Sequence, residues 1–149
     1  LKQINALIFL NYKPIGRNPD PSLLVKNSNV VSTFFKLVQR RYPFKIGFDS
    51  CSISGIAKYM NISPIFTECC EAGRFSVYIS EEMKMYPCSF MIDKIKGIDV
   101  SVDNIQKEWV ENEVFRGLRE KTYNSHCNKC DVLSLCSGGC RIFPEINLC

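Results

Sequence analysis

The sequence predicts an α+β protein in which a strand–helix–strand segment is followed by a β-hairpin, a helix and cysteine-rich loops. Two observations indicate this class. The stretch 5–10 is apolar on consecutive positions, which is typical of a strand in a buried parallel sheet, and 45–49 is predicted to form a second short strand. The chain has nine cysteines and one histidine. Five of the cysteines lie within 127–149, which indicates a metal centre.

The first strand leads into a loop marked by proline and glycine. Asp20, followed by Pro21, is predicted to cap a helix that reaches about Arg41. The apolar face expected for this helix consists of Leu23, Leu24, Val30, Val31, Phe34, Leu37 and Val38. A strand, a helix and a strand in this order predict a parallel pair joined by a right-handed crossover.

Arg17, Asp49 and Cys51 each follow the end of a predicted strand, which is where parallel α/β folds place functional groups. Arg17 is either a cofactor-binding residue or a loop cation. Asp49 is either a site residue or the cap of a helical segment over 54–61. Cys51 is either a small buried residue or a metal ligand, and the ligand interpretation is favoured.

The second half of the chain predicts a hairpin over 71–90 and an amphipathic helix over 102–123. Glu81 and Glu82 form the hairpin turn, so Cys70 and Cys88 are expected at the same end. The outward strand is expected to alternate Phe75, Val77 and Ile79 on one face. The helix is capped near Ser101 or Asp103, with an apolar stripe of Ile105, Trp109, Val110, Val114, Phe115 and Leu118; Trp109 is expected in the core.

Length and composition are those of a globular protein. The 149 residues are 46% hydrophobic and 23% charged, enough for one domain or slightly more. The net charge of +4 is mild and its lysines and arginines are scattered, so no nucleic-acid partner is expected. The apolar run 6–10 is too short to span a membrane. A cytoplasmic location is expected, and a reducing compartment with an odd cysteine count disfavours a disulfide framework.

The cysteine run has the spacing C-x2-C-x5-C-x3-C-x8-C, formed by Cys127, Cys130, Cys136, Cys140 and Cys149, with Gly138 and Gly139 inside it. Two four-cysteine iron-sulfur centres would use eight of the nine cysteines. The adjacent pair Cys69–Cys70 explains the ninth, since only one of the two is expected to ligate. A zinc-binding interaction module remains an alternative, because four-cysteine zinc sites also use C-x2-C.

This run resembles the SPASM domain, the auxiliary-cluster module at the C-terminus of many radical S-adenosylmethionine (SAM) enzymes. Two upstream segments share the resemblance, Cys70-Glu71-Ala72-Gly73-Arg74 and Tyr86-Pro87-Cys88-Ser89-Phe90. One departure is Met83, where the family usually has glycine. The resemblance implies that 1–52 is the closing βαβ portion of a partial (β/α)6 radical SAM barrel and that 53–149 is the SPASM domain.

The resemblance also implies the ligands of two 4Fe-4S clusters. One cluster would be held by Cys127, Cys130, Cys136 and Cys149. The other would be held by Cys70, Cys88, Cys140 and a fourth ligand, for which Cys51 is preferred to Cys69. If neither of these ligates, one iron of that cluster would be open to substrate.

For the parent enzyme, the resemblance implies an oxidoreductase that modifies a peptide or protein, commonly a ribosomally made peptide, by radical chemistry. The C-x3-C-x2-C motif of the SAM cluster is absent from the sequence. The chain is therefore expected to be a C-terminal part that needs an N-terminal barrel, SAM and an electron-donor protein, and to be inactive alone. No catalytic base can be chosen among the 15 carboxylates.

Overall fold

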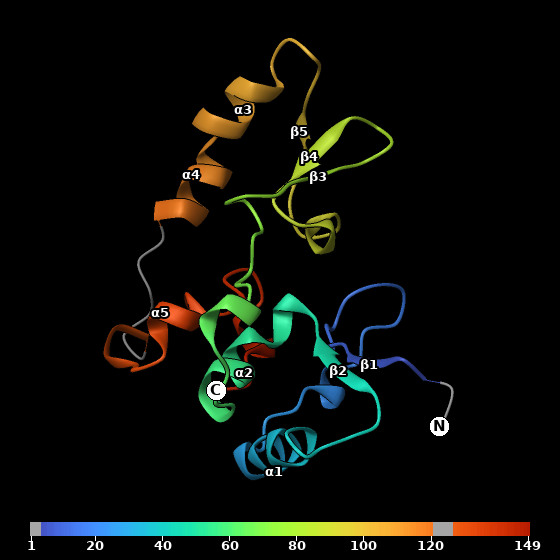
Figure 1. The fold of residues 1–149 in the computed structure, drawn as a ribbon. Coiled ribbons are helices and arrows are strands. Elements are labelled where there is room, and N and C mark those ends of the chain that lie inside the picture. The colour runs from blue at the N-terminus through green and yellow to red at the C-terminus, as the bar shows by residue number, and fades with distance from the viewer. Residues whose placement is uncertain (1–3, 121–126) are drawn as a thin grey trace. The chain divides into compact units, whose positions relative to one another are not determined.

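A computed structural model describes residues 4–120 and 127–149 (Figure 1). The fold is mixed α and β, with one two-stranded parallel sheet and one three-stranded antiparallel sheet, which agrees with the predicted class at this level. It divides into two compact units, the described parts of Leu1–Cys70 with Tyr123–Cys149, and of Glu71–Thr122. The two units are defined by how the chain packs, which does not test the domain boundary predicted between residues 52 and 53. That boundary stays a prediction. Within the described residues, no helix is long and apolar enough to cross a membrane.

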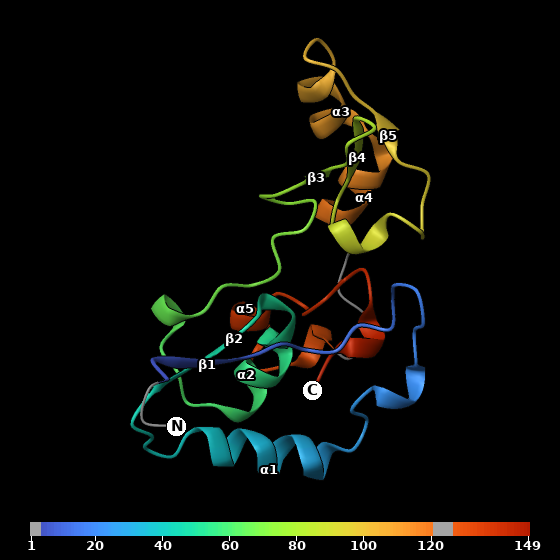
Figure 2. The same cartoon turned by 90° about the vertical axis from the view of Figure 1, so that its right-hand side faces the viewer.

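The first unit is built around two parallel strands, β1 (Ala6–Phe9) and β2 (Lys45–Phe48), with Ala6 opposite Lys45 and Phe9 opposite Phe48. The predicted parallel strand pair is confirmed. The expectation that the first strand is buried is wrong, because Leu7 is 40% and Ile8 56% exposed. The helix α1 (Ser28–Val38) lies alongside the two strands (Figure 2).

The helix predicted from Asp20 to Arg41 is interrupted. Asp20 does cap a helix, accepting from the Ser22 N–H at 2.9 Å, but this is the single turn η1 (Pro21–Leu23). The chain is extended at Leu24, and α1 begins afresh where the Asn27 side chain accepts from the backbone of Asn29 and Val30. The prediction missed this break because asparagine offers its neighbours a competing side-chain acceptor.

The core of the first unit is centred on Phe35, which is fully buried and was absent from the predicted apolar face. Val31, Val38 and Ile56 pack with it, whereas Val30 and Leu37 are largely exposed. The buried side of α1 is therefore rotated by about one residue from the predicted stripe. A second helix, α2 (Ile53–Tyr59), approaches Phe35 through Gly55, where a Cβ atom would overlap the Phe35 ring.

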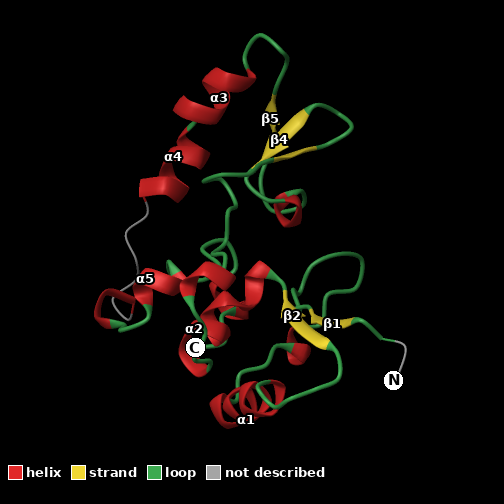
Figure 3. Cartoon of the chain, in the orientation of Figure 1, coloured by secondary structure: helices red, strands yellow, loops and turns green. Residues whose placement is uncertain are grey.

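The C-terminal segment belongs to the first unit and packs against its N-terminal part as loops and short helices (Figure 3). Its elements are η5 (Cys127–Lys129), α5 (Leu133–Cys136) and η6 (Pro144–Ile146). The Leu148 N–H donates to Ser54 Oγ at 2.8 Å, and Cys136 packs against Ile53 and Ala57 of α2. Two further short turns, η2 (Ser50–Ser52) and η3 (Pro64–Phe66), flank α2.

In the second unit, β3 (Tyr78–Ile79) and β4 (Lys84–Tyr86) form the predicted hairpin, and β5 (Ile98–Asp99) adds a strand that was not predicted. The strands are shorter than expected, and Phe75 is 73% exposed outside them. The turn η4 (Ser89–Met91) follows β4.

The helix predicted over 102–123 forms two helices, α3 (Ile105–Glu111) and α4 (Glu113–Glu120). Asn112 separates them, with an extended ψ of 132° and a side chain that accepts from the Val114 N–H. Trp109 packs beside Phe115 at a ring distance of 5.1 Å, so its predicted core position is confirmed. Positions 121–123 of the predicted helix lie outside the described residues.

Candidate metal centre

The carboxyl ends of β1 and β2 are joined by Asn11, the second residue after β1. Its backbone N–H donates to Asp49 Oδ1 at 3.2 Å. Its side-chain amide donates to the carbonyls of Cys51 at 3.1 Å and Ile146 at 2.8 Å. One asparagine therefore fixes the loop that carries Cys51 to the segment that follows Cys140.

Cys51 lies in η2, directly beyond the end of β2, as predicted. It packs against a hydrophobic cluster of Cys140, Phe143 and Ile146. Burial raises the pKa of the Cys51 thiol to about 11, against an opposing effect of Lys13 and with further increases from Asp49, Cys140 and Cys70. Cys51 thus has the Cys140 and Cys70 thiols in its surroundings, and all three were predicted to serve one cluster.

Cys140 is buried and held by two asparagine contacts and one sulfur contact. Asn147 accepts from the Cys140 N–H at 2.8 Å and donates to the Cys140 carbonyl at 3.2 Å. The Phe143 N–H donates to Cys140 Sγ at 3.2 Å. Donors of this kind stabilise a thiolate and orient it, which is how outer contacts prepare a ligand for a metal.

A second group of thiols forms at the C-terminal segment. Burial raises the pKa of Cys127, with further increases from Cys149 and Cys130 and an opposing effect of Arg141. The pKa of Cys136 is raised to about 11, first by burial and then by Cys149, with a smaller contribution from Cys127. These mutual effects relate the four cysteines predicted to hold the other cluster: Cys127, Cys130, Cys136 and Cys149.

The backbone around Cys136 is specialised. Ser137, Gly138 and Gly139 all have positive φ angles, of 51°, 85° and 63°, immediately after α5. The Gly139 N–H donates to the Cys136 carbonyl at 3.0 Å, and the backbone N–H groups of both glycines oppose the rise of the Cys136 pKa. The expectation that Gly138 and Gly139 offer N–H groups to the sulfurs of a bound cluster stays a prediction.

In the second unit, the two cysteine-flanking segments singled out in the sequence are hydrogen-bonded to each other. The Gly73 N–H donates to the Pro87 carbonyl at 3.1 Å. A Cβ atom at Gly73 would lie 3.2 Å from Pro87 Cβ, and the φ of Gly73 is 68°, so glycine suits this contact. Cys88 directly follows Pro87, while Cys70 is the last residue of the first unit's N-terminal part. The meeting of Cys70 and Cys140 with Cys88 stays a prediction.

The remaining candidates are less constrained. Arg17 is exposed in the loop after β1, and its cofactor-binding role stays a prediction, as does Cys69 as a substitute for Cys51. No cysteine of the described residues is in a disulfide, and in the same residues no group of three or more His, Cys, Asp or Glu has the geometry to hold a metal ion. In a 4Fe-4S cluster each cysteine binds a different iron, so its ligands are spread more widely than those of one ion.

Sequence reasoning missed Asn11, Lys13 and Asn147. Asn11 and Lys13 follow a strand end just as Arg17 does, so their position was an available signal, but nothing distinguished them from other loop residues. Asn147 lies two residues before Cys149, and its side chain accepts from the Cys140 N–H, seven residues earlier. No spacing rule reveals this contact.

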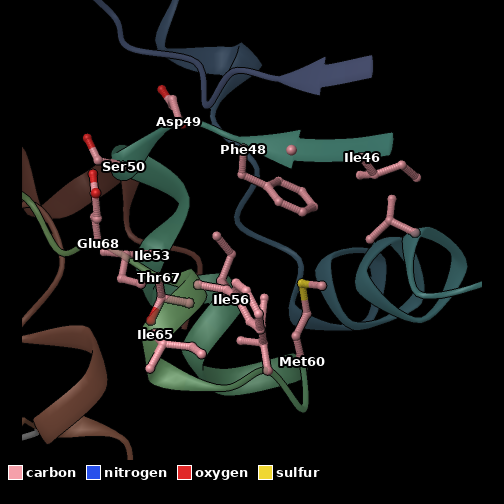
Figure 4. Close-up of a pocket in the computed structure, with 14 residues that line it drawn as sticks. Ile46, Phe48, Asp49, Ser50, Ile53, Ile56, Met60, Ile65, Thr67 and Glu68 are labelled. Carbon is pink, nitrogen blue, oxygen red and sulfur yellow. The ribbon is translucent and has the colours of Figure 1, made fainter. Parts of the chain in front are cut away.

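A groove of about 460 Å³ lies beside β2, lined mainly by apolar residues from β2, α2 and the segment around η3. In Figure 4 the Asp49 carboxylate points away from the Phe48, Ile56 and Met60 side chains. This orientation agrees with its contacts, since Asp49 pairs with Lys13 at 2.8 Å. Asp49 therefore borders the groove while its carboxylate is held by Lys13.

No family model, curated protein or solved structure matches this chain.

Proposed function

We propose that this chain is the auxiliary-cluster region of a radical SAM oxidoreductase with a SPASM domain, and that it binds two 4Fe-4S clusters. The observation that supports this proposal most is the sorting of the thiols within the first unit. Cys127, Cys130, Cys136 and Cys149 influence one another, and Cys51 is influenced by Cys140 and Cys70. The resemblance implies the first of these groups, and it implies the second together with Cys88, which belongs to the other unit.

The chain's own residues fit thiolate-bound clusters. The Phe143 N–H donates to the Cys140 sulfur, and the N–H groups of Gly138 and Gly139 oppose the rise of the Cys136 pKa. One cation, Lys13 or Arg141, lies close to each thiol group. When bound, such clusters exchange single electrons. In the proposed parent enzyme, the fold would hold them near a peptide or protein substrate, whose modification requires the N-terminal barrel, SAM and an electron donor. The chain alone is not expected to turn over substrate.

The test is iron, sulfide and zinc analysis of the chain prepared and reconstituted without oxygen. About eight irons and eight sulfides per chain are expected. Cys136→Ser should lose about four of each, and Cys51→Ser should also lose iron, whereas Cys69→Ser is the matched control that keeps the full content. One or two zincs without sulfide would overturn the proposal in favour of a zinc-stabilised interaction module.

A further inference from the structure

The ammonium group of Lys13 is enclosed at the carboxyl ends of β1 and β2. Its Nζ donates to the Asn11 carbonyl at 2.9 Å and to Asp49 Oδ2 at 2.8 Å. The ammonium is also close enough to the Cys51 thiol for each group to shift the pKa of the other. The Lys13 side chain is only 10% exposed, and that of Asp49 is 19% exposed.

An ion pair alone does not account for this arrangement. Removing an ammonium from water costs several kcal/mol, which one carboxylate offsets only in part. Asp49 is further held by the Asn11 N–H and by Ser52 Oγ at 2.8 Å, so the pair is fixed in place. The positive charge of Lys13 acts on Cys51, two residues after Asp49, and Cys51 in turn lies among Cys140, Phe143 and Ile146.

We propose that Lys13 is a positioning residue for the iron-sulfur cluster bound by Cys51, where its ammonium, fixed by Asn11 and Asp49 close to Cys51, raises the reduction potential of that cluster. This inference rests on the proposed function, because it requires Cys51 to be a ligand. Reduction adds one electron to the cluster and no bond forms or breaks at Lys13. A fixed cation close to the cluster favours its more negative, reduced form.

Asp49 is the opposing charge in this arrangement. Substituting Lys13 leaves the carboxylate unbalanced, which disfavours the reduced cluster. Substituting Asp49 by the isosteric asparagine leaves the ammonium unbalanced, which favours the reduced cluster. The two substitutions therefore shift the reduction potential in opposite directions. If the salt bridge were only structural, both substitutions would loosen the same loop and would change the potential in the same direction.

The experiment is a spectroelectrochemical titration of the full reconstituted chain as wild type, Lys13→Met, Lys13→Arg and Asp49→Asn. Lys13→Met should lower the reduced-to-oxidised ratio about tenfold at a given potential, equivalent to about 59 mV for one electron. Asp49→Asn should raise the ratio, and Lys13→Arg should stay close to wild type. The cluster of the Cys127 group is an internal control that should not shift, and Cys51→Ser and Cys136→Ser assign the two signals.

The outcomes separate the two proposals. Wild-type protein that acquires no iron and sulfide contradicts the proposed function itself. Two clusters with unchanged potentials in Lys13→Met, or shifts of the same sign in Lys13→Met and Asp49→Asn, overturn the role of Lys13 alone. If Lys13→Met does not fold, Asp49→Asn alone tests the role of Lys13. A raised reduction potential of the cluster bound by Cys51, and of that cluster only, supports this role. An unchanged potential overturns it.

Discussion

Three consecutive residues after α5, Ser137, Gly138 and Gly139, adopt left-handed backbone. The Gly139 N–H donates to the Cys136 carbonyl, and the N–H groups of Gly138 and Gly139 oppose the rise of the Cys136 pKa. Gly139 also lies against Asn147, which binds both backbone groups of Cys140. A short glycine turn therefore positions one predicted ligand of each cluster.

Gly139→Ala is expected to destabilise the metal-free protein by about 1–3 kcal/mol, because the new Cβ would overlap the Asn147 amide in a left-handed conformation. Urea unfolding at neutral pH measures the loss. Gly16→Ala is the matched control, since Gly16 also has a positive φ, of 97°, but has nothing within 4 Å of the added Cβ. Equal losses in both variants would show that the Asn147 contact does not constrain position 139.

Met83 adopts a φ of 56° in the turn between β3 and β4, at the position where the resembled family usually has glycine. Met83→Gly is therefore expected to leave the protein as stable as before or to stabilise it by up to about 1 kcal/mol, since relief of backbone strain offsets the added flexibility. Glu82→Gly, one residue earlier, should destabilise by about 0.5–1 kcal/mol. Thermal unfolding of both variants measures this difference. A clear loss of stability in Met83→Gly would mean that the backbone at Met83 is not strained.

At the scale of elements, the packing of α1 on α2 depends on the absence of a side chain at Gly55. Gly55→Ala would force the Phe35 ring out of its place, and we expect a loss of about 1–3 kcal/mol. Lys58→Ala, on the exposed side of the same helix, is the control and should change stability by less than about 0.5 kcal/mol. Equilibrium urea unfolding tests the pair; a tolerated Gly55→Ala would mean that α1 and α2 can separate at little cost.

The elements were predictable to different degrees, for physical reasons. The parallel strands, the hairpin and the site of Cys51 followed from apolar runs and turn residues. The breaks at Asn27 and Asn112 did not, because a side-chain amide competes with the helix only where tertiary packing allows it. The sequence also did not reveal that α1 buries the side that carries Phe35. Apolar residues occupy two neighbouring stripes of this helix, so the pattern does not say which stripe is buried.

The ligands of the candidate site stay a prediction, and the residues around them were not predicted. The resemblance implied two groups of cysteines, and within the first unit Cys127, Cys130, Cys136 and Cys149, and separately Cys51, Cys70 and Cys140, lie close enough to affect one another's pKa values. Asn11 donates to the Cys51 carbonyl, 40 residues away, and to the Ile146 carbonyl, 135 residues away, and Lys13 pairs with Asp49, 36 residues away. Such long-range hydrogen bonds leave no periodicity or motif in a single sequence.

At the scale of the whole molecule, the thiols link stability to pH. The pKa values of Cys51 and Cys136 are raised from 9.0 to about 11 in the folded state, mainly by burial. The folded metal-free protein thus retains protons that the unfolded chain releases between these values. Stability from this source is complete below about pH 9 and is lost as the pH rises toward about 11.

We therefore expect the melting temperature of the metal-free protein to fall steeply from about pH 9 to about pH 11. Lysines and tyrosines titrate in the same window, so the informative quantity is a difference between variants. Cys51→Ser with Cys136→Ser removes the two thiols, and its pH dependence should be shallower than that of the wild type even if its stability at pH 7 is lower. Calorimetry in reductant and chelator measures both slopes. Parallel slopes would mean that these thiols ionise as readily in the folded protein as in the unfolded chain, and the burial assigned to the two cysteines would then be wrong.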